Sequence, residues 1–321
     1  MIIVANKNQP FISICIPAYK NTSYLKRLLD SIAIQTFKDY DVFISDDSPD
    51  DAVEKLVATY SDRIPEIVYK SNSRPRGMPD NWNYAISQSK GQWKKIMHDD
   101  DWFSDKDSLS IFAAEAQKED IDFVFSNYVN QYLNKSKSKI VVFPKYKLKK
   151  VEENPLLLMS GNLIGPPSVC MIRAEVMVMY NPDLHWLVDI DYYIQVLLKK
   201  VGVAHISKAL ICIGVNQEQV TQSVKNNPTV EIGEAKKILD RYHENWLKNI
   251  VVYDGWWRLL RNMKVKSYDQ LTAYGGGNWP DLLIRMLEHQ RKVPYGLLKR
   301  GIFSKIFMFG SYLSQLPKMK D

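Results

Sequence analysis

The N-terminal part of this chain alternates short apolar runs with amphipathic helical patterns, and this alternation restricts the fold more than any other feature. The apolar runs, at residues 11–16, 41–45, 66–69 and 93–97, are long enough for buried strands and too short for helices. Between them, Thr22 or Ser23 can cap a helix with an apolar stripe, and further helical patterns cover 50–60 and 80–89. Strands and helices that alternate through short loops predict an α/β fold with a mostly parallel sheet.

Polar residues follow the end of each predicted strand, at Tyr19, Asp46 with Asp47, Asn72, and Asp99-Asp100-Asp101. Ligands of open α/β sheets bind at the carboxyl ends of the strands, so we expect these four groups to meet at one edge. Three adjacent carboxylates repel one another, and such groups commonly bind a divalent cation or line a polar site. The alternative is an acidic surface turn or helix cap, where aspartate is also favoured.

The rest of the chain divides into a second α/β stretch and a helical C-terminal region. Beyond the triplet, the sequence predicts a helix at 107–119, a strand at 121–126, an antiparallel excursion at 128–143 that turns at 134–139, a loop at 161–168, a strand at 169–173, a helix at 189–200 and a strand at 204–215. From about residue 226 the patterns become helical and rich in tryptophan, tyrosine and basic residues. We therefore predict domains at 1–225 and 226–321.

The net charge of +7 belongs to the C-terminal region, and this uneven placement argues against a broad nucleic-acid-binding face. Residues 226–321 hold 16 Lys/Arg and 9 Asp/Glu, and 291–321 alone hold 7 basic residues against 1 acidic residue. This distribution favours an anionic partner that is met at one end of the molecule. Three widely spaced cysteines, no secretory signal pattern and no long apolar run predict a cytoplasmic protein.

Four blocks of sequence resemble family 2-type inverting glycosyltransferases of the GT-A fold. They are Ile12-Ser-Ile-Cys-Ile-Pro-Ala-Tyr19, Val42-Phe-Ile-Ser-Asp-Asp-Ser48, Gly91-Gln-Trp-Lys-Lys-Ile-Met-His-Asp-Asp-Asp-Trp-Phe103 and Val188-Asp-Ile-Asp-Tyr-Tyr-Ile-Gln195. Each block alone is a weak signal, but their order and spacing together are specific. The resemblance implies a Rossmann-like, mostly parallel central sheet with helices on both faces, followed by the C-terminal helical region.

The resemblance also implies how a nucleotide-sugar donor would be held. Asp101 would ligate Mn²⁺ or Mg²⁺, which neutralises the diphosphate leaving group, while Asp99 and Asp100 would hold the ribose or a metal-bound water. Asp47 would accept from uracil or ribose, and Tyr19 would stack on the base. The donor-binding residues that it implies are Pro17, Ala18, Tyr19, Asp46, Asp47, Asn72, Asn83, Asp99 and Asp100. The alternative to donor binding is packing in the core for Tyr19 and an exposed position on a helix surface for Asn83.

Inversion needs one base to take the proton of the acceptor hydroxyl during in-line attack. The resemblance points to Asp189 as this base, with Asp191 as the second candidate, although Val188 replaces the first acid of the family's pair. The alternative is that both aspartates only begin a helix, where acidic residues are favoured by the helix dipole. The loop at 161–168 resembles a stretch that faces the acceptor, and a purely structural turn is equally compatible with it.

Two positions depart from the family's pattern. His98 stands where the family often has an acidic residue, and is either a donor behind the metal ligands or a satisfied histidine at a strand end. Gly214-Val-Asn216 stands where many relatives have Arg-x-His, ahead of Gln219-Val-Thr221. The missing histidine leaves the geometry of the metal site, and its dependence on metal, open.

The C-terminal tail has the pattern of a basic amphipathic helix. Its apolar stripe comprises Leu298, Ile302, Ile306, Phe309 and Leu313, widened by Phe303 and Phe307, and Arg300, Ser304 and Ser311 lie opposite. Such a helix is typical of a membrane-surface element, and the alternatives are packing on the protein core or against a second copy in a homo-oligomer.

We therefore expect a metal-assisted inverting glycosyltransferase that acts on a glycan or polyprenyl-linked acceptor in surface polysaccharide biosynthesis, at the inner face of the cell membrane. The second hypothesis is a non-catalytic nucleotide-sugar or glycan-binding module of the same fold. A nucleotidyltransferase is disfavoured, because Pro17-Ala-Tyr-Lys-Asn21 lacks the glycine-rich phosphate loop that such enzymes carry after the first strand.

Overall fold

A computed structural model describes residues 9–135, 137–215, 224 and 226–316. Contacts divide the chain into two compact units, the first comprising Met1–Glu152 and Leu163–Gln217, and the second Glu153–Asn162 and Glu218–Asp321. Residues 153–162 thus associate with the C-terminal part of the chain. The domain boundary that the sequence suggests near residue 226 stays a prediction.

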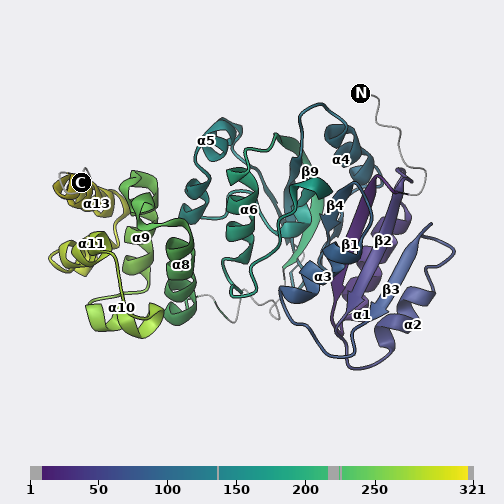
Figure 1. Cartoon of the computed structure of the whole chain (residues 1–321), viewed down its shortest axis with the longest axis horizontal. Helices are drawn as coiled ribbons and strands as arrows, with labels where there is room; N and C mark the ends of the chain where they lie inside the picture. The colour runs from purple at the N-terminus through teal and green to yellow at the C-terminus, as the bar shows by residue number, and fades with distance from the viewer. Residues whose placement is uncertain (1–8, 136, 216–223, 225, 317–321) are drawn as a thin grey trace. The chain divides into compact units, whose positions relative to one another are not determined.

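The first unit is built on one mixed sheet with the strand order β3-β2-β1-β4-β8-β6-β9-β5. Strands β3, β2, β1 and β4 lie side by side in Figure 1. Strands β1 (Ile12–Ala18), β2 (Tyr40–Asp46), β3 (Ile67–Ser71) and β4 (Trp93–Ile96) are parallel, as the sequence predicted. The connecting helices are α1 (Thr22–Ala33), α2 (Ala52–Ala58) and α3 (Asp80–Gln88). Parallel strands bring their carboxyl ends to the same edge, and the predicted fold class is confirmed.

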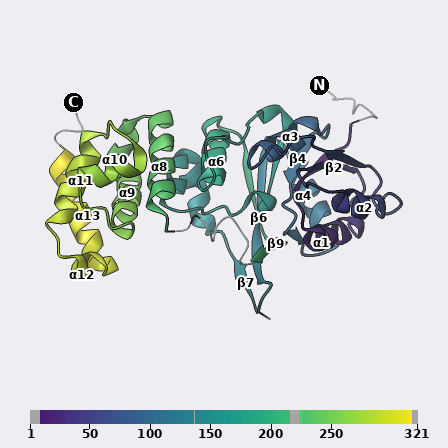
Figure 2. The same ribbon diagram turned by 90° about the horizontal axis from the view of Figure 1, so that it is seen from below.

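Helices cover both faces of this parallel part of the sheet, so β1 and β2 are buried, whereas the edge strand β3 is partly exposed. Ala85 of α3 packs with Cys15 and Phe43 on one face, and α1 lies on the other face (Figure 2). All seven residues of β1 and all seven of β2 are buried, which explains why apolar residues predominate in both strands.

The second half of the sheet turns antiparallel around the long strand β6 (Phe123–Tyr132). Its first residues pair with β8 (Cys170–Arg173) and its last with β7 (Lys137–Val141), while β9 (Val203–Val215) runs parallel along its other side (Figure 2). The short strand β5 (Trp102–Phe103) closes the edge against β9. The other α-helices among the described residues of this unit are α4 (Ser108–Ala116), α5 (Leu148–Glu153) and α6 (Val188–Leu198). The antiparallel pairing of β6 with β7 confirms the predicted antiparallel excursion at 128–143.

Two local predictions were wrong for identifiable reasons. Strand β1 continues through Pro17 to Ala18, because its pairing with β4 ends at Cys15 and Ile96 and no partner on that side needs the N–H that proline lacks. The cap of α1 is Asn21, whose side chain accepts from the backbone N–H of Tyr24 at 3.1 Å, rather than Thr22 or Ser23. Asparagine satisfies a helix N-terminus as well as serine does.

The second unit is helical. It comprises η2 (Pro155–Ser160), α8 (Pro228–Tyr242), η5 (Glu244–Lys248), α9 (Ile250–Asn262), α10 (Tyr268–Gly275), α11 (Asp281–Arg291), α12 (Tyr295–Leu298) and α13 (Gly301–Gln315). Trp256, Trp257 and Leu283 are buried in its core. Among the described residues, no helix combines the length and the apolar character that crossing a membrane requires.

Candidate active site

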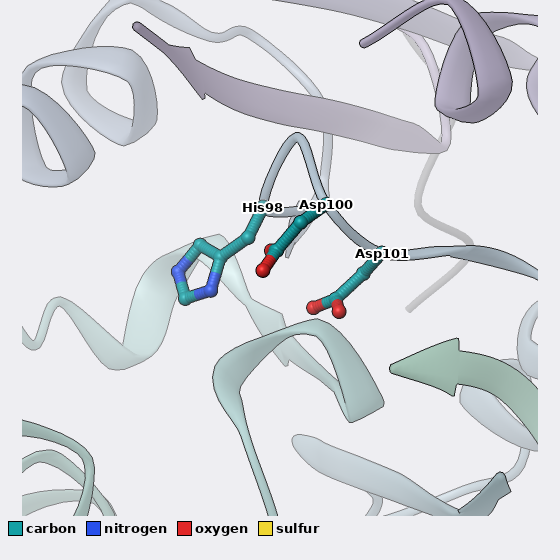
Figure 3. Close-up of side chains that lie close together, drawn as sticks. All are labelled: His98, Asp100 and Asp101. Atoms are coloured by element: carbon teal, nitrogen blue, oxygen red, sulfur yellow. The ribbon is translucent and has the colours of Figure 1, made fainter. Parts of the chain in front are cut away.

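The aspartate triplet lies in a tight turn directly after β4, which we call the aspartate turn (residues 98–101). The N–H of Met97 donates to the carbonyl of Cys15 in β1, and the N–H of Asp101 donates back to the carbonyl of His98. One ligand atom from each of His98, Asp100 and Asp101 lies within 4.8 Å of the others, and the three side chains extend from the same side of the turn (Figure 3). The resemblance predicted Asp101 alone as the metal ligand, and the structure places the carboxylate of Asp100 and the imidazole of His98 beside it.

Asp101 is the most enclosed of these three side chains, at 2 % exposure. Its Oδ1 accepts from the N–H of Gly214 at 3.2 Å, and the Ser168 hydroxyl also hydrogen-bonds to it. Burial, followed by the charge of Asp100, raises the pKa of Asp101 well above its ordinary value. Two carboxylates held together at this cost are stabilised when a cation lies between them, so the residues present fit a divalent metal.

His98 meets the requirements of a third ligand. Burial lowers the pKa of its imidazole to about 4, so the ring is neutral at physiological pH. Its Nε2 is buried and has no hydrogen-bond partner among the described residues. A neutral imidazole with an unused ring nitrogen beside two carboxylates is a normal coordination set for Mn²⁺.

Asp47 lies at the carboxyl end of β2, where three donors fix its carboxylate. Oδ1 accepts from Asn72 Nδ2 at 2.9 Å, and Oδ2 accepts from the N–H groups of Arg76 at 3.1 Å and Gly77 at 2.9 Å. A carboxylate offers about four acceptor positions, so one remains for a further donor. The structure thus brings together Asp47 and Asn72 as the sequence predicted.

Asp46 is fully buried and has internal partners on both oxygens. It accepts from the N–H of Ser48 at 2.9 Å and from the hydroxyl of Tyr69 at 2.7 Å. These bonds hold the turn that presents Asp47, which agrees with the expectation that Asp46 orients its neighbour. Two supporting residues, Ser45 and Asn81, were missed because their 2.5 Å hydrogen bond joins positions 36 residues apart.

Tyr19 lies at the end of β1 with 52 % of its surface exposed, so it is not a core residue. Its backbone N–H hydrogen-bonds to Asp99, which ties the end of β1 to the aspartate turn. Burial and the neighbouring Asp100 raise the pKa of Asp99 to about 7. Pro17 and Ala18 are buried in β1 and set the direction in which Tyr19 leaves the sheet.

Asn83 uses its side-chain amide on the chain itself. Its Nδ2 donates to the carbonyl of Tyr180 and its Oδ1 accepts from the N–H of Tyr180, both at 2.8 Å. The ring centroid of the neighbouring Trp82 lies 4.4 Å from that of His98 and 5.2 Å from that of Tyr180. Asn83 therefore fixes the position of Tyr180 in an aromatic cluster beside the aspartate turn.

The two candidate bases differ in burial. Asp189, at the start of α6, is partly exposed, and the desolvation it experiences raises its pKa to about 7. Asp191 is fully buried, and its Oδ2 accepts from Gln195 Nε2 at 2.8 Å. A partly exposed carboxylate with a pKa near neutrality suits a general base better than a buried and hydrogen-bonded one. Asp189 also acts electrostatically on Tyr180, which places it near the aromatic cluster.

The loop before β8 contacts the aspartate turn through Ser168. This residue belongs to the loop at 161–168, for which the sequence left open an acceptor-facing stretch or a structural turn. Lys95, buried in β4, donates to the carbonyls of Ser168 at 2.6 Å and Cys170 at 3.3 Å. Burial lowers the pKa of this lysine to about 7. The presence of Lys95 inside a predicted strand was the sequence signal that could have pointed to these hydrogen bonds to the loop before β8. The departure at Asn216, with Gln219 and Thr221, lies outside the described residues.

Residues 13–177 match the sequence profile of Glycosyl transferase family 2, and this stretch is more than half of the chain. The chain belongs to glycosyl transferase family 2. It is a glycosyltransferase, and its matched region contains Asp47, the aspartate turn and Ser168.

Curated relatives agree with this membership. The glycosyltransferase is 26% identical over 230 residues to an uncharacterized glycosyltransferase of Rickettsia typhi, covering 69% of each chain. It is 25% identical over 241 residues to the UDP-Glc:alpha-D-GlcNAc-diphosphoundecaprenol beta-1,3-glucosyltransferase WfgD of Escherichia coli, covering 74% of this chain and 89% of WfgD.

Solved structures share the fold of this glycosyltransferase at low sequence identity. S. aureus TarS 1-349 in complex with UDP-GlcNAc aligns with a TM-score of 0.57 and 15% identity, over 88% of this chain and 90% of that chain. The mannosyltransferase PcManGT from Pyrobaculum calidifontis, in complex with GDP-Man and Mn2+, aligns with a TM-score of 0.54 and 12% identity, over 97% and 88%. This chain spans 52% of the length of a longer S. aureus TarS chain.

Proposed function

We propose that this glycosyltransferase transfers a sugar from a UDP-sugar, with inversion, to a lipid-linked glycan acceptor in surface polysaccharide biosynthesis. The observation that carries the proposal is the cluster of His98, Asp100 and Asp101 at the carboxyl end of β4, beside the strand ends that present Tyr19 and Asp47. Three neighbouring parallel strands end at this edge. Strand β2 ends at the carboxylate of Asp47, β1 at the ring of Tyr19, and β4 at the group proposed to bind the cation.

The preference for a uridine nucleotide rests on Asp47 and Tyr19. The remaining acceptor position of Asp47 fits the single imide N–H of uracil, and the exposed ring of Tyr19 fits stacking on a base. The names of two similar proteins support the same choice, since WfgD uses UDP-Glc and a TarS structure contains UDP-GlcNAc.

His98, Asp100 and Asp101 would hold Mn²⁺ or Mg²⁺, and the bound ion would supply positive charge against the diphosphate leaving group. Asp100 thereby becomes a ligand together with Asp101, whereas Asp99 is left for the ribose or a water. Gly214 and Ser168 fix Asp101 by hydrogen bonds, so the ligand set is organised before any ion binds.

Asp189 is the proposed general base. Its carboxylate takes the proton of the acceptor hydroxyl as that oxygen forms a bond to the anomeric carbon. The bond from the anomeric carbon to the phosphate oxygen breaks, and its electron pair leaves with UDP. A single displacement of this kind inverts the configuration at the anomeric carbon. The lipid-linked nature of the acceptor rests on the similarity to WfgD, which acts on a diphosphoundecaprenol-linked sugar.

The test is release of UDP from UDP-glucose and UDP-N-acetylglucosamine, measured with Mn²⁺ and an undecaprenyl-diphosphate-linked acceptor. Asp101→Asn and Asp189→Asn should each lower turnover by at least about a thousandfold with unchanged folding. Asp105→Asn, on the exposed stretch after β5, is the matched control and should keep full activity. Donor binding without any turnover would instead support the non-catalytic binding module, which Val188 and Asn216 keep open.

A further inference from the structure

Helix α13 packs on its own unit mainly through polar residues and presents its apolar stripe to solvent. Ile302 is 78% exposed, Ile306 61%, Phe309 48% and Leu313 45%, and the four lie on one face at helical spacing. The residues it buries are Ser304, Met308, Ser311 and Gln315. This arrangement is the reverse of an ordinary surface helix, whose apolar face points to the core.

Hydrogen bonds fix this orientation. The Ser304 hydroxyl accepts from Trp257 Nε1 and Arg261 Nη1, both at 3.0 Å. The Ser311 hydroxyl lies 2.7 Å from both the Tyr253 hydroxyl and His289 Nδ1. A rotation that hid the apolar stripe would break these hydrogen bonds and leave buried polar groups without partners, which is unfavourable.

The charge around the exposed stripe is of one sign. Residues 291–316 contain no acidic residue, and the basic side chains in this stretch are all exposed: Arg291, Lys292, Lys299, Arg300 and Lys305. An apolar strip flanked by cations is complementary to a membrane surface, where acyl chains receive the apolar residues and anionic headgroups meet the basic ones.

We propose that the outer face of α13 docks the chain on an anionic membrane surface. With 15 residues, α13 is about 22 Å long, which is shorter than the hydrocarbon core of about 30 Å, so the helix lies on the membrane and does not cross it. Leu298, which the sequence placed in the stripe, is buried at the end of α12 and does not take part.

A second copy of the chain is a poorer occupant of the same face. In a two-fold dimer formed through α13, each stripe would meet its symmetry mate, and the flanking cations of both copies would be brought together without acidic partners. Like charges held close in this way oppose association. The inference does not depend on which sugar the site transfers, or on whether it transfers one.

The experiment measures flotation of the full chain with vesicles of phosphatidylcholine, with and without one third phosphatidylglycerol. Ile306→Glu with Phe309→Glu should weaken binding to the anionic vesicles at least tenfold. Ile34→Glu is the matched control, because Ile34 lies in the first unit and is 59% exposed. It should bind as the unmodified chain does, and both variants should keep the thermal shift produced by UDP with Mn²⁺.

Three results would overturn the proposal. The first is undiminished vesicle binding by the double variant, and the second is absence of vesicle binding by the unmodified chain. The third is a dimer in solution, measured by analytical ultracentrifugation, that becomes a monomer in the double variant. That last outcome would assign the face to a second copy of the chain.

Discussion

The backbone N–H of His98 donates to the hydroxyl of Ser168 at 3.0 Å, and this bond joins the aspartate turn to the loop before β8. Ser168 is fully buried, and its hydroxyl also bonds to Asp101. One side chain thus fixes both ends of the turn that carries the cluster of His98, Asp100 and Asp101. The position of the cluster depends on a residue 70 positions away in the sequence.

Ser168→Ala should loosen the cluster. The variant removes the partner of a buried N–H and one of the bonds to Asp101, so we expect unfolding free energy to fall by about 1–3 kcal/mol. We also expect Mn²⁺ affinity, measured by isothermal titration, to fall about tenfold or more. Ser87→Ala is the control, since Ser87 is exposed on α3 and its hydroxyl bonds to near neighbours in sequence, Tyr84 and Gln88. Equal Mn²⁺ affinity in both variants would contradict the role given to Ser168.

Gly214→Ala should displace the aspartate turn from the other side. A Cβ at Gly214 would lie 2.3 Å from the backbone carbonyl oxygen of Asp100, and backbone cannot move away as a flexible side chain can. We expect a loss of about 1–3 kcal/mol in stability together with weaker Mn²⁺ binding. Gly310→Ala, which meets nothing within 4 Å, should be neutral or slightly stabilising in the same denaturation experiments. An unperturbed Gly214→Ala variant would show that this close approach is not required.

Tyr19→Ala should weaken donor binding without affecting folding. Loss of base stacking is worth about 1–3 kcal/mol, so the dissociation constant for UDP should rise at least about fivefold. Because Tyr19 is half exposed, the melting temperature should stay close to that of the unmodified protein. Tyr146→Ala, at 73 % exposure in η1 (Lys145–Lys147), is the control for removing an exposed tyrosine. Unchanged UDP affinity would remove Tyr19 from the donor site.

The activity of the enzyme should follow the ionisation of Asp189. Since its pKa is about 7 rather than the ordinary 3.8, kcat/KM should rise with pH and level off above about 7. The free energy of unfolding changes with pH in the opposite direction to kcat/KM. The folded state holds this proton more tightly than the unfolded chain does, so stability declines as pH rises from about 4 to about 7. Asp189→Asn should make that decline shallower, and an equally steep decline would contradict the raised pKa.

Asp191→Asn separates the two candidate bases. It disturbs a buried carboxylate with a hydrogen bond from Gln195, so we expect a lower melting temperature. Turnover per folded molecule should stay within about threefold of the unmodified enzyme. A loss of turnover as large as that of Asp189→Asn, at unchanged stability, would transfer the role of base to Asp191.

The sequence alone determined the α/β architecture and the family. Strands such as β1 and β2 are buried on both faces, so apolar residues predominate in their sequences, and the loops between them are short. These properties are local and can be read directly along the chain. For the same reason the sequence located the residues that follow each strand, including Tyr19, Asp47 and the aspartate triplet.

Only the tertiary structure decided how the site is supported and which way α13 faces. Ser168, Gly214 and Asn81 act through hydrogen bonds or close contacts with residues distant in sequence, and no local pattern encodes such pairs. In α13 the apolar stripe was visible, but its direction was not. Buried hydrogen bonds to Ser304 and Ser311 turn that stripe outward, because an unpaired buried polar group costs more than an exposed apolar one.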